Sequence, residues 1–333
     1  MHKNLSDIKI FVSNTIPDIG IELLRNEGFH VTAWTEDKPI RREVLLAEAK
    51  KCNALLSSGG TKIDEQFLSE CKHLDIISQF GVGYDNIDIT AATKLGIPVG
   101  NTPGVLSDAT ADTAFGLMIA VSRKMFYMHK RIAKGEWTHF SPKAHLGIEL
   151  KNKTLGVFGL GRIGIEMAKR CKGAYDMEII YHNRKHNKEA EQLLNAKWVS
   201  FDELLQHSDI LSIHSVLSEE TKGIFNKDAF GKMKASAIFI NTSRGGLHNE
   251  EDLIEALTTN KIWGAGLDVT NPEPMQKDNP LLEMENVAVL PHIGSATVEA
   301  RNAMSRLAAE NIIDFYKNGR IPNFVNPEVK KKL

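Results

Sequence analysis

The chain has 333 residues, of which 42% are apolar and 25% are charged, and at roughly 150 residues per domain this length predicts two globular domains. Such an apolar composition excludes an intrinsically disordered chain. The 41 Lys and Arg residues and the 42 Asp and Glu residues leave a formal charge of −1, so no excess of positive charge favours nucleic acid as a partner.

The cysteines and the N-terminus indicate the compartment. Cys52, Cys71 and Cys171 are too far apart in the sequence for a disulfide scaffold or a zinc knuckle. Residues 1–7 are polar, and the longest apolar run, Ala114 to Val121, is far shorter than the ~18 residues of a membrane span. We therefore expect a cytoplasmic protein without a membrane partner.

Short apolar segments alternate with helical patterns along most of the chain, as they do where crossover helices join buried parallel strands. The first series of predicted strands is Ile8–Val12, Val31–Trp34, Ala54–Ser57, Ile76–Ser78 and Ile97–Val99. The second is Thr154–Phe158, Glu178–Tyr181, Ile210–His214, Ala237–Asn241, Ile262–Val269 and Val287–Leu290. The sequence thus predicts an α/β fold with two doubly wound, Rossmann-like parallel-sheet domains.

A long helix, from about Leu106 to Lys134, is predicted between the two series. Its first half is apolar all round, so a neighbouring domain or another subunit must cover it; a central helix inside one large domain is the alternative. The last predicted helix runs from about Thr297 to Asn318, where a glycine and a later proline form a stop signal. The lysines at 330–332 are expected to be a solvated end.

A glycine-rich turn follows the first strand of the second series. Gly159, Gly161 and Gly164 form the pattern GxGxxG between that strand and a predicted helix. In a dinucleotide-binding turn these glycines allow a tight turn, close approach of the pyrophosphate and packing of helix on strand. The N–H groups at the start of the helix, at Arg162 and Ile163, would help to hold the phosphates.

The end of the next strand predicts which dinucleotide is bound. An NAD-preferring site places Asp or Glu there, whereas this chain has Asn183, Arg184 and Lys185. Because Arg184 and Lys185 supply charge for a 2′-phosphate, we predict NADP(H) in preference to NAD; a solvated basic loop that tolerates NAD is the alternative. His182 and His186 fall at a strand end, and no metal site is expected there.

Three polar segments, 241–246, 266–274 and 290–297, follow strands of the second series, where the ligand crevice of a parallel sheet lies. Reduction of a ketone needs a cation to orient the substrate, an acid to protonate the developing alkoxide and a carboxylate to keep that acid charged. Arg244, His292 and Glu273 match these needs in that order. Each alone is an ordinary surface residue; together, beside a dinucleotide turn, they predict a reducing site.

These motifs, with segments 79–88 and 135–138, resemble those of the D-isomer-specific 2-hydroxyacid dehydrogenase family over nearly the whole chain, and most closely its glyoxylate reductase/hydroxypyruvate reductase group. The resemblance implies that Arg244 binds the substrate and that Glu273 tunes His292, which exchanges the proton. It also implies a discontinuous substrate-binding domain, 1–103 with 296–333, a dinucleotide-binding domain, 104–295, and an active site in the cleft between them.

The resemblance places further residues in the site. The backbone amides of Val82 and Gly83 would hold the substrate carboxylate, although a simple tight turn is the alternative. Ser58 would line the substrate side chain, and the glycines after it favour a small or hydroxylated group. The remaining predicted cofactor contacts are Thr110, Ser215, Val216, Thr242, Asp268 and Gly294.

The predicted function is the NAD(P)H-dependent reduction of glyoxylate to glycolate and of hydroxypyruvate to D-glycerate. The resemblance implies a homodimer through the central helices, in which Trp137 reaches the partner's substrate pocket; local packing of Trp137 is the alternative. A 2-ketogluconate reductase is the alternative within the same chemistry. A dinucleotide-sensing corepressor without turnover is the alternative from another class.

Overall fold

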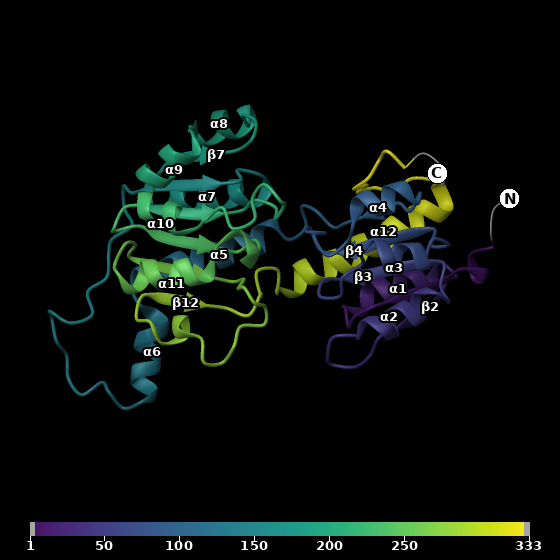
Figure 1. Ribbon diagram of the computed structural model, residues 1–333, viewed down its shortest axis with the longest axis horizontal. Coiled ribbons are helices and arrows are strands. Elements are labelled where there is room, and N and C mark those ends of the chain that lie inside the picture. Colours follow the sequence, from purple (N-terminus) through teal and green to yellow (C-terminus); the bar gives the residue numbers. More distant parts are fainter. Residues whose placement is uncertain (1–3, 330–333) are drawn as a thin grey trace. The chain divides into compact units, whose positions relative to one another are not determined.

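The computed structural model describes residues 4–329; the first three residues and the lysines at 330–332 lie outside this range. The described chain divides into two compact units, residues 4–106 with 296–329 and residues 107–295. In Figure 1 the first unit contains both the purple start and the yellow end of the chain. No helix within the described range is long and apolar enough to cross a membrane.

The first unit is built on a five-stranded parallel sheet in the order β2-β1-β3-β4-β5. Its strands are β1 (Lys9–Val12), β2 (His30–Ala33), β3 (Ala54–Ser58), β4 (Ile76–Phe80) and β5 (Val99–Gly100). Its helices are α1 (Asp18–Asn26), α2 (Arg42–Ala49), α3 (Glu65–Glu70), α4 (Ile89–Lys94) and α12 (Val298–Asn318), with a 3-10 turn η1 (Leu5–Asp7). Every residue of β4 is buried, so both faces of the sheet are covered, as its continuous apolar pattern requires.

The C-terminal helix α12 belongs to this first unit because it packs against α1 and β4. A Cβ at Gly20 would lie 2.3 Å from the carbonyl oxygen of Ser305, so only glycine lets α1 approach α12 this closely. The hydroxyl of Ser78 in β4 donates a hydrogen bond of 2.8 Å to the carbonyl of Ala308. Helix α12 ends at Gly319 in the left-handed conformation, which confirms the predicted stop.

The second unit is built on a seven-stranded parallel sheet in the order β12-β11-β10-β9-β6-β7-β8. Its strands are β6 (Thr154–Phe158), β7 (Glu178–His182), β8 (Lys197–Trp198), β9 (Ile210–Ile213), β10 (Ile238–Asn241), β11 (Gly264–Leu267) and β12 (Val287–Val289). Its helices are α5 (Ser107–Ser122), α6 (Met125–Ala133), α7 (Arg162–Tyr175), α8 (Lys188–Leu194), α9 (Phe201–His207), α10 (Lys227–Lys232) and α11 (Glu250–Thr258), with 3-10 turns η2 (Gly245–Leu247) and η3 (Pro280–Glu283).

Successive side chains along the strands of this sheet pack alternately into two separate hydrophobic cores. Val157 packs into a core with α5, α7 and α8, whereas the next residue, Phe158, packs into a core with α9, α10 and α11. Successive side chains of a strand point to opposite faces, so helices cover the sheet on both sides (Figure 1). The prediction of two doubly wound α/β units is confirmed.

The predicted single helix from Leu106 to Lys134 is wrong, because the chain forms two helices, α5 and α6. Lys124 adopts a left-handed conformation between them, with φ of 54°. The carbonyl of Ser122 accepts a hydrogen bond from the backbone N–H of Ile148, so it is not available to continue the helix. Most of the apolar run in α5 is buried in the core of its own unit, and no other subunit is needed to cover it.

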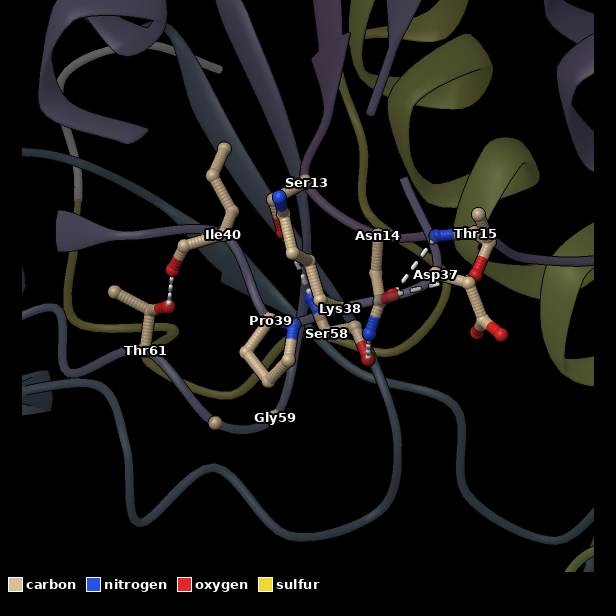
Figure 2. A pocket seen from close by; sticks show the side chains of 11 residues that line it. Ser13, Asn14, Thr15, Asp37, Lys38, Pro39, Ile40, Ser58, Gly59 and Thr61 are labelled. Carbon is tan, nitrogen blue, oxygen red and sulfur yellow. Dashed lines mark hydrogen bonds between the residues drawn. The ribbon is translucent and has the colours of Figure 1, made fainter. Parts of the chain in front are cut away.

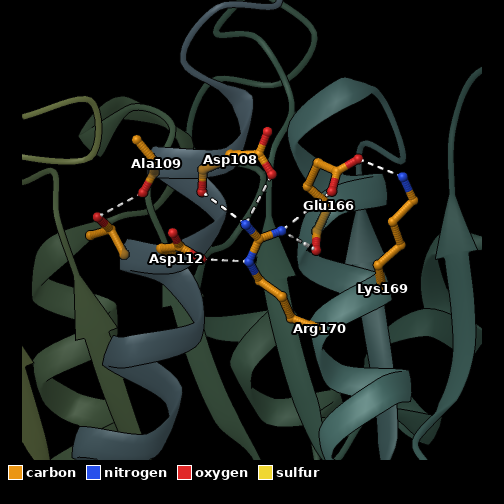
Figure 3. A network of polar contacts seen from close by, with 7 residues as sticks. Asp108, Ala109, Asp112, Glu166, Lys169 and Arg170 are labelled. Atoms are coloured by element: carbon orange, nitrogen blue, oxygen red, sulfur yellow. Dashed lines mark hydrogen bonds and ion pairs between the residues drawn. The ribbon is translucent and has the colours of Figure 1, made fainter. Parts of the chain in front are cut away.

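Arg170 of α7 fixes the first turns of α5 (Figure 3). Its Nε lies 2.6 Å from Asp112, its Nη2 lies 3.0 Å from Asp108, and its Nη1 donates to Glu166 within α7. One guanidinium therefore joins two helices through a planar fork that lysine could not reproduce. The turn of α5 held in this way also carries Thr110.

Candidate active site

The glycine-rich turn connects β6 to α7. Gly159 has φ of 97°, and a Cβ there would lie 2.7 Å from the backbone nitrogen of Ser215, so a side chain is excluded by both conformation and space. A Cβ at Gly164 would lie 2.7 Å from the carbonyl oxygen of Gly159, whereas one at Gly161 would meet nothing within 4 Å. The turn is thus tight at its two ends and open at Gly161.

The open position at Gly161 precedes the first residues of α7. The N–H groups of Arg162 and Ile163 belong to the first turn, where no intrahelical acceptor exists. Because β6 lies between β7 and β9, this turn stands at the point where the strand order reverses, and ligands of doubly wound sheets bind there.

The end of β7 contains the residues predicted to select the dinucleotide. The Oδ1 of Asn183 accepts a hydrogen bond of 2.7 Å from the N–H of Leu160, so Asn183 braces the glycine-rich turn. The Arg184 side chain is 87% exposed, with Nη1 3.9 Å from Glu220, and Lys185 is also exposed. Two cations therefore stand in solvent beside the turn.

The two histidines near this strand end do not come together. His182 bonds through Nδ1 to the carbonyl of Val199, while His186 pairs with Glu191 at 2.8 Å and stacks on Trp198. No group of three or more His, Cys, Asp or Glu side chains that could hold a metal ion occurs among residues 4–329.

The loops after β9 and β10 complete the edge of the sheet. Ser215 packs against Gly159, and Val216 is 58% exposed. Thr242 is buried, and its Oγ1 has no hydrogen-bond partner within the described chain. A buried hydroxyl normally has a partner, so a bound ligand would satisfy it.

Arg244 lies on a loop fixed by Asn241. The Asn241 Nδ2 donates to the carbonyl of Arg244 at 2.9 Å and lies 3.1 Å from Nδ1 of His248, while its Oδ1 accepts the N–H of Ser243. Burial lowers the pKa of His248 to about 4, so the neutral ring accepts at Nδ1. Sequence reasoning gave no role to Asn241 or His248, and only the structure shows that they position Arg244.

His292 and Glu273 form a direct pair, with Nδ1 of His292 lying 2.5 Å from Oε1 of Glu273. Burial raises the pKa of Glu273, but the hydrogen bond and charge of His292 and the charge of Arg244 oppose it, and the net pKa is lowered. The ionised carboxylate therefore stabilises the fold at neutral pH, and this contribution is lost as the pH falls through the lowered pKa. Both His292 and Arg244 therefore act to lower the pKa of the Glu273 carboxyl group.

The backbone around His292 is strained and anchored. His292 has φ of 55°, a left-handed conformation that costs free energy in a non-glycine residue. The buried Asp268 carboxylate accepts the N–H groups of Ile293 at 2.8 Å and Gly294 at 2.7 Å. A Cβ at Gly294 would lie 3.3 Å from Thr110, so Thr110, Asp268 and Gly294 lie together, as expected of one site.

The first unit carries the remaining predicted residues. The N–H groups of Val82 and Gly83, after β4, make no hydrogen bond to other parts of the described chain, while Asn101 Nδ2 donates to the Val82 carbonyl and fixes the turn. Ser58 stands at the end of β3, beside Phe80 of β4 in register. Two open amides and a hydroxyl therefore share one edge of this sheet.

The residues present fit a nicotinamide dinucleotide. The second unit offers an open glycine-rich turn at a helix start, two exposed cations at the ribose end and an unsatisfied buried hydroxyl at Thr242. These are the features that a pyrophosphate, a substituted ribose and further polar groups of such a ligand require.

Comparison with known proteins agrees with this geometry. Residues 115–294 match the model of the D-isomer specific 2-hydroxyacid dehydrogenase, NAD binding domain. A glyoxylate reductase of Thermococcus litoralis is 44% identical over 96% of this chain and 97% of its own length. The chain belongs to the D-isomer specific 2-hydroxyacid dehydrogenase family. The predicted family is thereby confirmed, and the protein is an enzyme with a nicotinamide dinucleotide as cofactor.

Two other members of this family bear on substrate and cofactor. A probable 2-ketogluconate reductase of Dictyostelium discoideum is 41% identical over 99% of both chains. The structure of an NADPH-dependent glyoxylate/hydroxypyruvate reductase from Sinorhizobium meliloti, in complex with NADP and malonate, aligns with a TM-score of 0.84 at 30% identity over 97% of both chains.

Proposed function

We propose that this D-2-hydroxyacid dehydrogenase reduces glyoxylate to glycolate and hydroxypyruvate to D-glycerate, with NADPH as the preferred cofactor. The observation that carries the proposal is the 2.5 Å pair of His292 and Glu273, in the unit that also presents Arg244 and the open glycine-rich turn. Glyoxylate reductases at 39 to 44% identity over 96% or more of the chain support the choice of substrate.

Each side chain has a distinct role in this proposal. Arg244 binds the carboxylate and carbonyl of the keto acid, because a planar guanidinium offers paired donors to such groups. His292, held by Glu273, gives its proton to the developing alkoxide. The amides of Val82 and Gly83 take the substrate carboxylate, and Ser58 lines the substrate side chain. The cofactor, when bound, supplies the hydride.

As the resemblance implies, residues 1–103 with 296–333 would form the substrate-binding domain, and residues 104–295 would form the dinucleotide-binding domain, which also supplies Arg244, Glu273 and His292. Gly159, Gly161, Gly164, Arg162 and Ile163 would hold the pyrophosphate. The other cofactor contacts would be Thr110, Asn183, Arg184, Lys185, Ser215, Val216, Thr242, Asp268 and Gly294.

The preference for NADPH rests on Arg184 and Lys185, since both are exposed cations beside the ribose end of the turn, and Asn183 stands where an NAD-preferring site places Asp or Glu. The Sinorhizobium meliloti relative, described as NADPH-dependent, supports the same choice.

We also propose a homodimer, although not through α5, whose apolar run is buried in its own unit. Five of the twelve large apolar side chains that are exposed in the described chain lie on α6 and the segment after it, at Met125, Ile132, Trp137, Phe140 and Leu146. The segment after α6 is a long loop that projects from the rest of the second unit (Figure 1). An exposed apolar stretch of this kind is typical of an interface, and Trp137, 72% exposed, would contact the partner there.

Steady-state rates of the purified protein test the proposal. With NADPH, we expect turnover of glyoxylate and hydroxypyruvate, with D-glycerate as the only enantiomer formed from the latter, and a lower kcat/KM with NADH. Negligible turnover of both acids, together with cofactor-dependent oligomerisation, would instead favour the corepressor alternative. A higher kcat/KM with NADH would contradict the role given to Arg184 and Lys185.

A further inference from the structure

Glu273 lies on an exposed loop between β11 and η3. We call this loop, residues 271–279, the glutamate loop; all of its residues except Met275 and Asn279 are exposed. The Glu273 side chain itself is 41% exposed. An exposed loop has many conformations of similar free energy, so the 2.5 Å pairing of Glu273 with His292 requires contacts that hold this loop.

Glu250, the first residue of α11, joins the two ends of the glutamate loop. Its Oε2 accepts the backbone N–H of Asn271 at 3.2 Å, and its Oε1 accepts Nδ2 of Asn279 at 2.6 Å. These partners are the first and last residues of the loop, so one partly buried carboxylate closes it. Fixing the two ends of a loop lowers the number of conformations that it can adopt.

Both groups that face Glu250 are hydrogen-bond donors, and neither can become an acceptor. The donor of Asn271 is a backbone N–H group. The amide of Asn279 is oriented by its other end, because its Oδ1 accepts the N–H of Leu281 at 3.0 Å, and Leu281 is buried in the same core as α11. A carboxylate offers two acceptor oxygens, whereas the amide of glutamine offers one. The contact is therefore matched to glutamate.

The segment that carries Arg244 also contacts the chain just before the glutamate loop. A Cβ at Gly245 would lie 1.9 Å from the carbonyl oxygen of Thr270, so the two backbones touch where only glycine fits. Thr270 Oγ1 donates to the carbonyl of Pro272 at 2.8 Å and fixes the start of the loop. The short segment from Arg244 to Glu250 thus presents the predicted substrate-binding cation and closes the glutamate loop.

The start of α11 does not depend on Glu250. The side chain of Asn249 accepts the N–H of Asp252 at 3.1 Å and caps the helix. Glu251, the next residue, is exposed and supplies a second negative charge to the first turn, where the helix dipole favours it. Substitution of Glu250 should therefore leave the helix in place and release the loop.

We propose that Glu250 is a positioning residue of this enzyme. By closing the glutamate loop it holds the Glu273 carboxylate against Nδ1 of His292, and this contact keeps the imidazole protonated for the reduction. The effect of Glu250 on the reaction runs entirely through Glu273. The inference rests on the proposed function, because the roles of Glu273 and His292 come from it.

Release of the loop should change the pH dependence of the reaction. A carboxylate beside an imidazole favours the protonated form of the imidazole, which is the form that reduction consumes. The other charged groups near the pair are Arg244, whose charge helps to lower the pKa of Glu273, and Asp268. Burial raises the pKa of the Asp268 carboxyl group, while the charge of His292 opposes that rise. Only Glu273 stands on the loop that Glu250 closes.

The pH profile of kcat/KM for glyoxylate, with NADPH, tests the proposal. We expect Glu250→Ala to move the alkaline limb to lower pH by about one unit and to lower kcat at neutral pH roughly tenfold or more. The Kd of NADPH should stay within about twofold of wild type. Glu250→Gln keeps the size of the side chain and one acceptor, so it should give a smaller shift in the same direction. The matched control, Glu251→Ala, should keep the wild-type profile.

A double variant shows whether Glu250 acts through Glu273. Glu273→Gln alone should move the alkaline limb at least as far as Glu250→Ala does. Adding Glu250→Ala to Glu273→Gln should then move the limb no further, because two residues that act through one contact are not additive.

The outcomes separate this inference from the proposed function. If both Glu250 variants keep the wild-type alkaline limb while Glu273→Gln moves it, or if the shifts add in the double variant, the positioning role is wrong and the proposed function stands. A profile unchanged by Glu273→Gln would overturn both this inference and the role of Glu273 in the proposed function. If Glu250→Ala fails to fold, the profile of Glu250→Gln decides between the same outcomes.

Discussion

Replacement of His292 by glutamine is expected to lower kcat for glyoxylate reduction by roughly 10²–10⁴-fold, the usual contribution of a positioned general acid. Glutamine keeps the polarity and approximate size of the side chain but has no proton to give at neutral pH. The Kd of NADPH, measured by calorimetry, should stay within about twofold of wild type, since the glycine-rich turn and the basic residues after β7 are separate from His292.

The control for this variant is His207→Gln, an exposed histidine at the end of α9, which should retain wild-type kcat. If His292→Gln reduced glyoxylate at a rate close to that of this control, His292 would not be the acid. If His292→Gln lost NADPH binding as well, the loss of activity would come from a disturbed structure. The left-handed backbone at position 292 would then be the origin of that disturbance.

Replacement of Arg244 by lysine is expected to raise KM for glyoxylate roughly 10–100-fold, which corresponds to the loss of a hydrogen bond between charged groups. Lysine keeps the positive charge but loses the planar pair of donors that a carboxylate and an adjacent carbonyl require. Asn241 and His248 hold the backbone of the loop independently of the side chain at 244, so the loop should keep its conformation.

Arg306→Lys, on the exposed face of α12, is the matched substitution and should leave KM at the wild-type value. An unchanged KM in Arg244→Lys would remove Arg244 from substrate binding. A fall in kcat alone, with KM unchanged, would indicate instead that Arg244 stabilises only the transition state.

Buried strands were predictable from the sequence because their signal is local. β6 was predicted with its observed bounds, and β3 within one residue, since consecutive apolar residues between turn residues are typical of parallel strands covered on both faces. β8 was missed because both of its residues, Lys197 and Trp198, are exposed and give no apolar run. The break between α5 and α6 was missed because its cause, the bond from Ile148 to Ser122, comes from a distant segment.

The residues of the candidate site likewise fall into two groups, those that a local sequence motif predicts and those that only folding brings together. Gly159 and the helix after it form a contiguous motif, and His292, Glu273 and Arg244 follow strands in short recognisable segments, so their types were predictable. The Asn241 and His248 network depends on side chains that meet only after folding. So does the hydrogen bond between Asn14 and Ser58, which are 44 positions apart in the sequence (Figure 2). No periodicity or spacing could indicate such a contact.

The central claim is that Arg244, His292 and Glu273 act together on one keto acid, and a crystal structure of this protein with NADP and malonate tests it most directly. We expect one malonate carboxylate to contact the guanidinium of Arg244. The imidazole of His292 should lie within hydrogen-bond distance of the same malonate, while its Nδ1 stays paired with Glu273. Malonate bound elsewhere, with Arg244 and His292 turned away from it, would contradict the account.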